Sequence, residues 1–251
     1  MTLNIVAIYP DLLGTYGDTG NAMILAKRAL WRGIDASLTL AKSTDPLPNG
    51  DLYCLGGGED GPQVLAAEQL TSDGTLTRAA ESGAVIFGVC AGFQILGVSF
   101  PGDRGSAHEG LGLIDVVTVK GTGQRAVGEL AATVATVEQG GLGLPDLTGF
   151  ENHGGVTTLG PASAPLGTTL IGVGNGGGDA SEGAVQDNVI CTYLHGPVLA
   201  RNPALADLLL ARALHVEELA PLNDERELLL HRERLDAAMQ AKNREGSARQ
   251  P

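Results

Sequence analysis

The stretch from Ala84 to Gly97 reads Ala-Val-Ile-Phe-Gly-Val-Cys-Ala-Gly-Phe-Gln-Ile-Leu-Gly. Residues 84–88 form a short apolar run of the kind that is buried in a parallel sheet. Cys90 follows in a Gly-x-Cys-x-Gly frame that it makes with Gly88 and Gly92. This spacing is typical of a nucleophile elbow, a sharp strand-to-helix turn that exposes its central residue, here with cysteine in place of serine. Because only glycine fits where strand and helix approach so closely, we interpret Cys90 as a nucleophile rather than as one more buried hydrophobic residue.

Strands and helices are predicted to alternate along the first hundred residues, with short connections. This order is typical of a parallel sheet covered on both faces. After about Phe100 the sequence becomes rich in Val, Thr and Ile with glycine turns, which predicts a mixed or antiparallel β region. The expected fold is therefore α/β, with a mainly parallel central sheet and additional β structure in the second half. The expected early strands are Leu3–Tyr9, Ala36–Leu40 and Asp51–Leu55, and the later ones are Leu111–Val119, Gly128–Val137 and Leu170–Val173.

The last part of the chain is predicted to be helical. A strand over Asn188–Leu194 leads to His195, and helices follow over 204–214 and 223–242. The tail 243–251 is expected to be disordered. We therefore expect one domain over residues 1–215 and a C-terminal helical extension with a tail over 216–251.

Composition excludes several classes of function. The net charge of −13 argues against nucleic acid or an anionic membrane surface as partner. There is no apolar run long enough to span a membrane and no basic residue ahead of the N-terminal apolar run, so neither a membrane span nor a signal peptide is expected. Three cysteines, an odd number without paired spacing, suit a reducing cytoplasm. The absence of Cys-x-x-Cys and His-x-x-x-His pairs predicts no metal site.

Two glycine-rich segments need an interpretation. Gly56-Gly57-Gly58 directly follows a predicted strand but lacks the Gly-Lys-Ser/Thr of a phosphate loop, so its N–H groups are expected to face a developing oxyanion. Gly172-x-Gly174-x-x-Gly177 matches the dinucleotide-binding pattern, but no helix is predicted after it. Its Asn-Gly pair at 175–176 indicates a tight turn instead.

A cysteine nucleophile needs a base that the fold places nearby. His195 is favoured because it follows an apolar strand and so reaches the same edge of the sheet as Cys90. His153, in the segment 149–155, is the alternative. The polar loop 12–21, which contains Asp18 and Asn21, is expected either to bind a ligand at this edge or to cap the following helix.

These segments together resemble a known family. Gly-Val-Cys-Ala-Gly-Phe-Gln at 88–94, the triple glycine and Tyr-Leu-His-Gly at 193–196 are similar to class I glutamine amidotransferases, in particular their cobyric-acid-synthase-like branch. Tyr-Pro-Asp-Leu-Leu-Gly-Thr-Tyr-Gly-Asp-Thr-Gly-Asn at 9–21 and Gly-Phe-Glu-Asn-His-Gly-Gly at 149–155 resemble the glutaminase (GatD) subunits of lipid II isoglutaminyl synthases. The resemblance implies a three-layer, flavodoxin-like fold.

The resemblance also implies catalytic roles. Cys90 would attack the carboxamide carbon of L-glutamine, and His195 would take the thiol proton and pass one to the departing ammonia. The backbone N–H groups of Ala91 and Gly57 would form the oxyanion hole.

Two further residues are implied to bind the substrate. Gln94 would help to shape the glutamine pocket, unless it is an ordinary amide on a helix surface. Arg125 would bind the α-carboxylate, since a guanidinium binds a carboxylate with two parallel hydrogen bonds, unless it is simply an exposed loop arginine.

One departure from the family pattern concerns the third catalytic residue. Class I amidotransferases with a full triad carry His-x-Glu, whereas Pro197 stands two residues after His195. The sequence therefore predicts a Cys–His dyad, and one hypothesis is that a partner protein supplies the missing carboxylate.

The chain shows no ATP-binding motif, so activation of the ammonia acceptor is expected in another protein. The resemblance names this partner as a Mur-ligase-like subunit (MurT) that forms a heterodimer with the chain, carries ATP and Mg and amidates D-glutamate of the lipid II stem peptide in peptidoglycan biosynthesis. No cofactor is expected in this chain itself. The alternatives are a subunit of a cobalamin-pathway (corrinoid) synthase, a cysteine hydrolase of the protease or chaperone type, and a non-catalytic binding subunit.

Overall fold

The computed structural model describes residues 2–102 and 106–248, with side chains up to 242. Its central sheet has six strands in the order β13-β14-β4-β3-β1-β2. All neighbours pair in parallel except β13, which is antiparallel to β14. The mainly parallel central sheet that the sequence predicts is therefore confirmed. Its strands are β1 (Leu3–Ile8), β2 (Ala36–Ala41), β3 (Leu52–Leu55), β4 (Val85–Val89), β13 (Ala184–Gln186) and β14 (Val189–Thr192).

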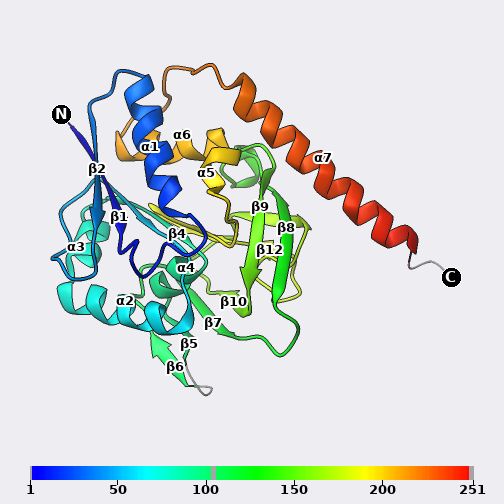
Figure 1. The fold of residues 1–251 in the computed structure, drawn as a ribbon, viewed down its shortest axis with the longest axis horizontal. Coiled ribbons are helices and arrows are strands. Elements are labelled where there is room, and N and C mark those ends of the chain that lie inside the picture. Colours follow the sequence, from blue (N-terminus) through cyan, green and yellow to red (C-terminus); the bar gives the residue numbers. More distant parts are fainter. Residues whose placement is uncertain (1, 103–105, 249–251) are drawn as a thin grey trace.

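Helices cover both faces of this sheet. On one face α1 and α6 contact each other and the strands, and α2 and α4 lie against the other face (Figure 1). The strands at the centre of the sheet are apolar along their whole length, as expected for a sheet buried on both sides. The helices are α1 (Thr19–Trp31), α2 (Asp60–Asp73), α3 (Thr75–Glu81), α4 (Ala91–Leu96), α5 (Val198–Arg201), α6 (Pro203–Ala213) and α7 (Glu225–Ala248).

The second half of the chain adds two four-stranded sheets, in the orders β10-β7-β5-β6 and β12-β11-β8-β9. They confirm the predicted β region. The second of them is joined to the end of the central sheet by a bridge in which Phe150 and His195 exchange two backbone hydrogen bonds. The added strands are β5 (Ser99–Pro101), β6 (Ala107–Glu109), β7 (Val116–Lys120), β8 (Ala126–Thr133), β9 (Leu147–His153), β10 (Gly155–Leu159), β11 (Gly167–Ile171) and β12 (Ser181–Glu182).

One predicted strand begins later than the sequence indicates. The range 111–119 is expected to be extended throughout, but β7 begins at Val116. The N–H groups of Leu111 and Leu113 donate instead to the carbonyls of Ile95 and Leu96 at the end of α4. These residues therefore satisfy the last turn of a short helix and cannot join a ladder at the same time.

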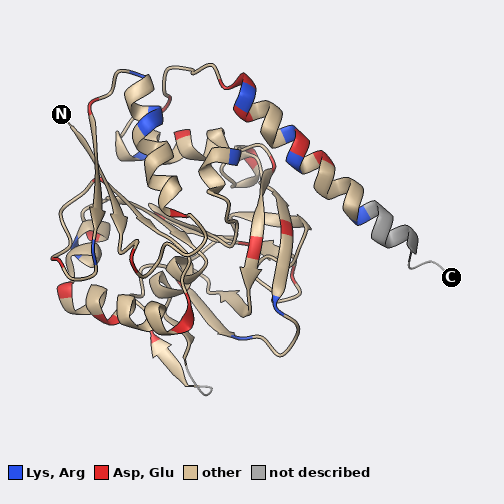
Figure 2. Cartoon of the chain, in the orientation of Figure 1, with Lys and Arg blue, Asp and Glu red and all other residues tan. Residues whose placement is uncertain are grey.

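The C-terminal helix is longer than predicted. Helix α7 begins at Glu225 and continues to Ala248, so the expected disorder is wrong for residues 243–248, and 249–251 lie outside the described residues. Helix-forming residues (Arg, Glu and Ala) recur past 242, which is consistent with the extension. The helix contacts α5, β8, β9 and β11, and acidic and basic residues alternate along it (Figure 2). No helix in the described part of the chain has both the length and the apolar character needed to cross a membrane.

A buried arginine fastens α1 to the C-terminal helices. Arg28 is 1% exposed and bonds Asp207 of α6 and Asp224, just before α7, at 2.7–2.8 Å. Burial alone would lower the pKa of Arg28, but the two carboxylates outweigh it and raise that pKa above its ordinary value. Without the guanidinium, both carboxylates would remain partly buried and uncompensated.

We expect Arg28→Ala to lower the free energy of unfolding by about 3 kcal/mol, because removing one partner of a buried ion pair leaves the other charge unpaired. Urea titration measures this change. Lys27→Ala, at an exposed position on the same helix, is the matched control and should change stability by less than about 0.5 kcal/mol. Equal effects of the two substitutions would contradict this role of Arg28.

Candidate active site

The structure places Cys90 at a tight turn between β4 and α4, with φ 52° and ψ −103°. A non-glycine residue rarely adopts such a backbone, and it persists only when its surroundings fix it. A Cβ on Gly88 would lie 2.7 Å from the Leu96 side chain, and one on Gly92 would lie 2.6–2.9 Å from Leu55. The expected reason for the two glycines is therefore confirmed: side chains there would prevent the strand and helix from closing around Cys90.

A carboxylate of this chain orients His195. The Nδ1 atom of His195 lies 2.8 Å from Oδ2 of Asp18, and both residues are almost fully buried. Asp18 stands at the start of α1 but makes no capping bond with its side chain. The predicted dyad is therefore corrected to a Cys90–His195–Asp18 arrangement, and the hypothesis that a partner must supply the carboxylate loses its basis.

The environment makes His195 a strong base. Burial by itself lowers the pKa of this imidazole, but its interactions with Asp18 and Cys90 outweigh burial and raise the pKa from 6.5 to about 9. With Nδ1 held by Asp18, the buried Nε2 is the nitrogen left to exchange a proton with the Cys90 thiol.

Sequence reasoning missed the role of Asp18 because 177 residues separate it from His195. The available signal was its position after β1, since loops at the carboxyl ends of parallel strands meet at one edge of the sheet. Helix capping explained an aspartate at that position equally well, so the pattern alone did not distinguish the two roles.

The triple-glycine loop serves a different purpose from the predicted one at Gly57. The Gly57 N–H donates to Asp18 Oδ2 at 2.9 Å, so it is engaged and does not face the pocket. A Cβ on Gly57 would lie 2.7 Å from Cε1 of His195, and one on Gly56 would lie 2.2 Å from the Leu13 carbonyl oxygen. The assignment of Gly57 to the oxyanion hole is therefore corrected. Its neighbour Gly58 lines the pocket with Cys90 and Ala91.

A pocket of about 180 Å³ opens beside Cys90 and brings most of the predicted site residues together. Gln94 lies in its wall, buried rather than on a helix surface, where its amide accepts a hydrogen bond from Gln63 and donates one to Tyr193. Arg125 also lines the pocket, although the sequence allowed an exposed loop position. The lining residues that bear on the chemistry are Gly58, Cys90, Ala91, Gln94, Arg125 and His153.

His153, the alternative base, lies in the same pocket but in another setting. It ends β9, stacks on Tyr193 with ring centroids 3.8 Å apart, and its Nδ1 lies 3.1 Å from the Gly155 carbonyl oxygen. The carboxylate beside its ring, that of Glu151, lies 3.7 Å from Nε2 and so beyond hydrogen-bond distance. His195 is therefore better placed to act as the base.

The other two cysteines are poor nucleophiles. Cys54 in β3 and Cys191 in β14 are buried, and burial raises the pKa of both thiols well above the ordinary value.

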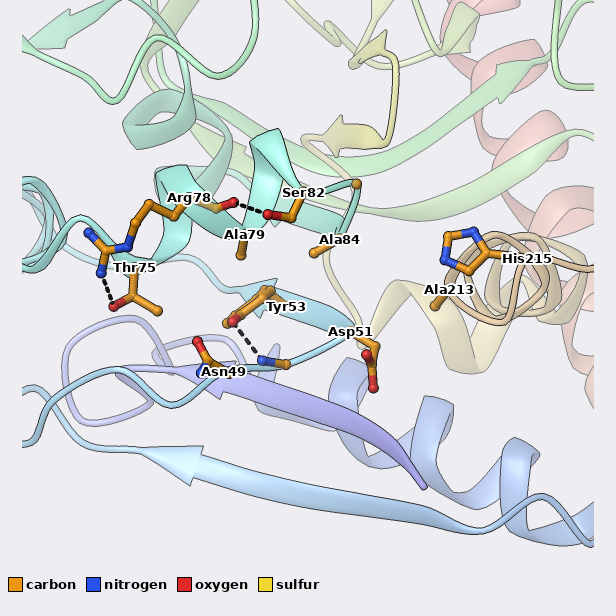
Figure 3. Close-up of a pocket in the computed structure, with 12 residues that line it drawn as sticks. Asn49, Asp51, Tyr53, Thr75, Arg78, Ala79, Ser82, Ala84, Ala213 and His215 are labelled. Atoms are coloured by element: carbon orange, nitrogen blue, oxygen red, sulfur yellow. Dashed lines mark hydrogen bonds between the residues drawn. The ribbon is translucent and has the colours of Figure 1, made fainter. Parts of the chain in front are cut away.

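A larger pocket, of about 310 Å³, lies at the opposite edge of the sheet (Figure 3). Its polar groups bond one another: Arg78 donates to Thr75, and the Gly50 N–H donates to the Tyr53 hydroxyl. Its lining residues include neither a cysteine nor a carboxylate–histidine pair, so it offers no comparable chemistry.

Residues 4–203 match the CobB/CobQ-like glutamine amidotransferase domain family. Two curated relatives are the GatD subunits of lipid II isoglutaminyl synthase (glutamine-hydrolyzing). The one from Streptococcus pneumoniae is 32% identical over 215 residues, with 84% of this chain and 80% of the relative covered. The one from Staphylococcus aureus is 35% identical over 214 residues, with 84% of each chain covered. A cobyric acid synthase from Pelotomaculum thermopropionicum is 34% identical over 178 residues, but only 32% of its length is covered.

Solved structures agree on the fold. A putative GMP synthase glutaminase-type chain from Thermoplasma acidophilum aligns with a TM-score of 0.54 at 16% identity, covering 86% of this chain and 96% of the other. PurLQS from Thermotoga maritima aligns with a TM-score of 0.53 at 18% identity, covering 85% and 95%. Together with the match over residues 4–203, these findings show that the chain belongs to the CobB/CobQ-like glutamine amidotransferase family.

Proposed function

We propose that this chain is the glutaminase subunit of a lipid II isoglutaminyl synthase, which releases ammonia from L-glutamine for a Mur-ligase-like partner. The observation that carries the proposal is the Cys90–His195–Asp18 arrangement beside a pocket that also contains Arg125. Similarity to two GatD subunits over 84% of the chain narrows the family to this branch.

The proposed reaction begins with proton transfer from the Cys90 thiol to Nε2 of His195. The sulfur then attacks the carboxamide carbon of glutamine, and the imidazolium returns the proton to the departing nitrogen, so that ammonia leaves and a thioester remains. Asp18 holds the imidazole with Nε2 toward the sulfur and stabilises the positive charge on the ring. Water, activated by the same imidazole, then hydrolyses the thioester to glutamate and restores the thiol.

The pocket supplies groups for the rest of the substrate. The Ala91 N–H, at the start of α4, and the Gly58 N–H are the proposed donors to the tetrahedral oxyanion, because both residues line the pocket with Cys90. Arg125 is the proposed partner of the α-carboxylate. Gln94 stays fixed by its bonds to Gln63 and Tyr193 and forms the wall behind the nucleophile.

The ammonia must reach an acceptor before it is lost to protonation in water. We propose a heterodimer in the cytoplasm with a MurT-like protein that binds ATP and Mg and activates the D-glutamate carboxylate of lipid II. A corrinoid synthase is the second candidate, favoured by the similarity to a cobyric acid synthase. That match covers only 32% of the longer enzyme, whereas the GatD relatives are covered over 80% and 84% of their length.

Glutamate release from L-glutamine, measured with the purified chain alone and with a MurT-like protein, ATP and Mg, tests the activity. We expect release by the wild type and none by Cys90→Ala, while Cys54→Ala retains it because that thiol is buried away from the pocket. Amidation of lipid II, and none of a corrinoid, is expected in the presence of the partner. If Cys90→Ala remained active, or the wild type released no glutamate even with the partner, the proposed function would be wrong.

Replacing Asp18 by Asn should lower kcat by roughly 10³-fold, because the amide neither stabilises the imidazolium nor fixes the tautomer. Asn21→Ala is the control from the same loop; its side chain bonds the Leu199 N–H, away from the imidazole. Steady-state kinetics should show a near-normal kcat for Asn21→Ala, provided that circular dichroism shows it folded. A wild-type kcat for Asp18→Asn would instead support a dyad.

Stability should depend on pH through His195. Because folding raises the pKa of His195 from 6.5 to about 9, its contribution is fully present below about pH 6.5 and is lost as pH rises through 9. The difference in unfolding free energy between wild type and His195→Asn should therefore shrink as pH rises from about 6.5 through 9. His215→Asn, at an exposed position with φ 55° that asparagine tolerates, should show no such trend. A difference that stays constant across this range would refute the assignment.

A further inference from the structure

Arg125 is held in place by a neighbouring asparagine. Its Nε donates to Oδ1 of Asn152, and its Nη2 donates to the Asn152 carbonyl oxygen at 3.0 Å. One edge of the guanidinium is therefore fixed against β9. Its end, formed by Nη1 and the second N–H of Nη2, stays available to a carboxylate in the pocket.

The same asparagine reaches the loop that carries Asp18. Nδ2 of Asn152 donates to the Tyr16 hydroxyl at 3.0 Å. The two groups of its amide are thus divided, with the oxygen on the arginine and the nitrogen on the tyrosine. Because an amide cannot turn over without losing both bonds, the position of Arg125 and the position of Tyr16 are tied to each other.

The Tyr16 ring lies directly against the catalytic imidazole. The centroids of Tyr16 and His195 are 4.8 Å apart at an interplanar angle of 56°. Gly57 fills the remaining space, since a Cβ there would lie 3.2 Å from Cδ2 of Tyr16 and 2.7 Å from the His195 ring. The three groups are closely packed, so a shift of Tyr16 displaces the imidazole or the glycine loop.

We propose that Asn152 and Tyr16 are positioning residues that connect the α-carboxylate site at Arg125 to the catalytic His195. The proposal rests on the proposed glutaminase function. A carboxylate bound at Arg125 fixes the guanidinium, which fixes Asn152, Tyr16 and finally the ring of His195 facing Cys90. Binding energy from the non-reacting end of glutamine is thereby used to align the base. The site would select against amides that lack the α-carboxylate by lowering their kcat, and not only by raising their KM.

Two conservative variants separate the steps of this connection. Tyr16→Phe keeps the ring against His195 and removes only the hydroxyl, so kcat should fall about 10-fold while KM for glutamine stays near the wild-type value. Asn152→Ala also frees Arg125, so it should raise KM as well as lower kcat. The double variant should be no slower than Asn152→Ala, because both substitutions break one chain of contacts.

The decisive comparison uses L-glutamine and its α-amide, which lacks the negative charge. Wild type should turn over glutamine with a kcat at least about 10-fold above that of the α-amide, and in Tyr16→Phe this ratio should approach one. Tyr53→Phe is the matched control: its hydroxyl accepts from the Gly50 N–H at the opposite edge of the sheet (Figure 3), so it should keep the wild-type ratio even if stability falls.

The outcomes distinguish this proposal from the proposed function. If wild type hydrolyses glutamine but Tyr16→Phe keeps both its kcat and its preference for glutamine over the α-amide, the connection does not exist and the glutaminase assignment stands. Fully additive effects of the two variants would also overturn it. If wild type releases no glutamate even with a MurT-like partner and ATP, the proposed function fails, and this inference fails with it. Calorimetric titration with L-glutamate, which needs no turnover, should show weaker binding in Asn152→Ala than in Tyr16→Phe.

Discussion

A single carboxylate oxygen holds the site together. Oδ2 of Asp18 lies 2.8 Å from the His195 ring and accepts the Gly57 N–H at 2.9 Å. A buried carboxylate is costly unless it is paired and hydrogen-bonded, so these two contacts have to form together. They join the loops that follow β1, β3 and β14. Strands with parallel direction bring those three loops to one edge, so the chemistry depends directly on the topology of the sheet.

The β structure of the second half completes this edge and does not form a separate unit. The bridge between Phe150 and His195 holds β9 next to the end of β14. As a result Arg125 and His153 line the same pocket as the nucleophile and Gly58 of the glycine loop. The central sheet supplies the reacting groups, and the added sheets supply the wall that recognises the substrate. This division explains how one fold can keep the hydrolytic step while changing what surrounds it.

The presence of Asp18 changes how a partner would matter. All three groups of the hydrolytic centre come from this chain, so a partner is not needed to provide a carboxylate. Any dependence of glutamine hydrolysis on assembly would then act on the geometry of the pocket, for example through the loop 12–21, which carries both Asp18 and Tyr16. The glycine loop is constrained in the same way, because Gly56 and Gly57 have no room for a side chain against that loop and His195.

The amino-acid sequence was sufficient to predict the elbow at Cys90, the parallel strands around it and the choice of His195. Strand and helix periodicity and the two flanking glycines are local properties, and they identified the edge of the sheet where the site lies. The role of Asp18, the engagement of the Gly57 N–H and the contacts of Arg125 with Asn152 could not be predicted in this way, since each joins residues that are distant in the chain. The polar composition beyond 242 suits both a solvated helix and a disordered segment, so the end of α7 was also beyond the reach of pattern. These points required the folded chain, because only there does the loop after the first strand pack against the end of β14, where a buried carboxylate must find its partners.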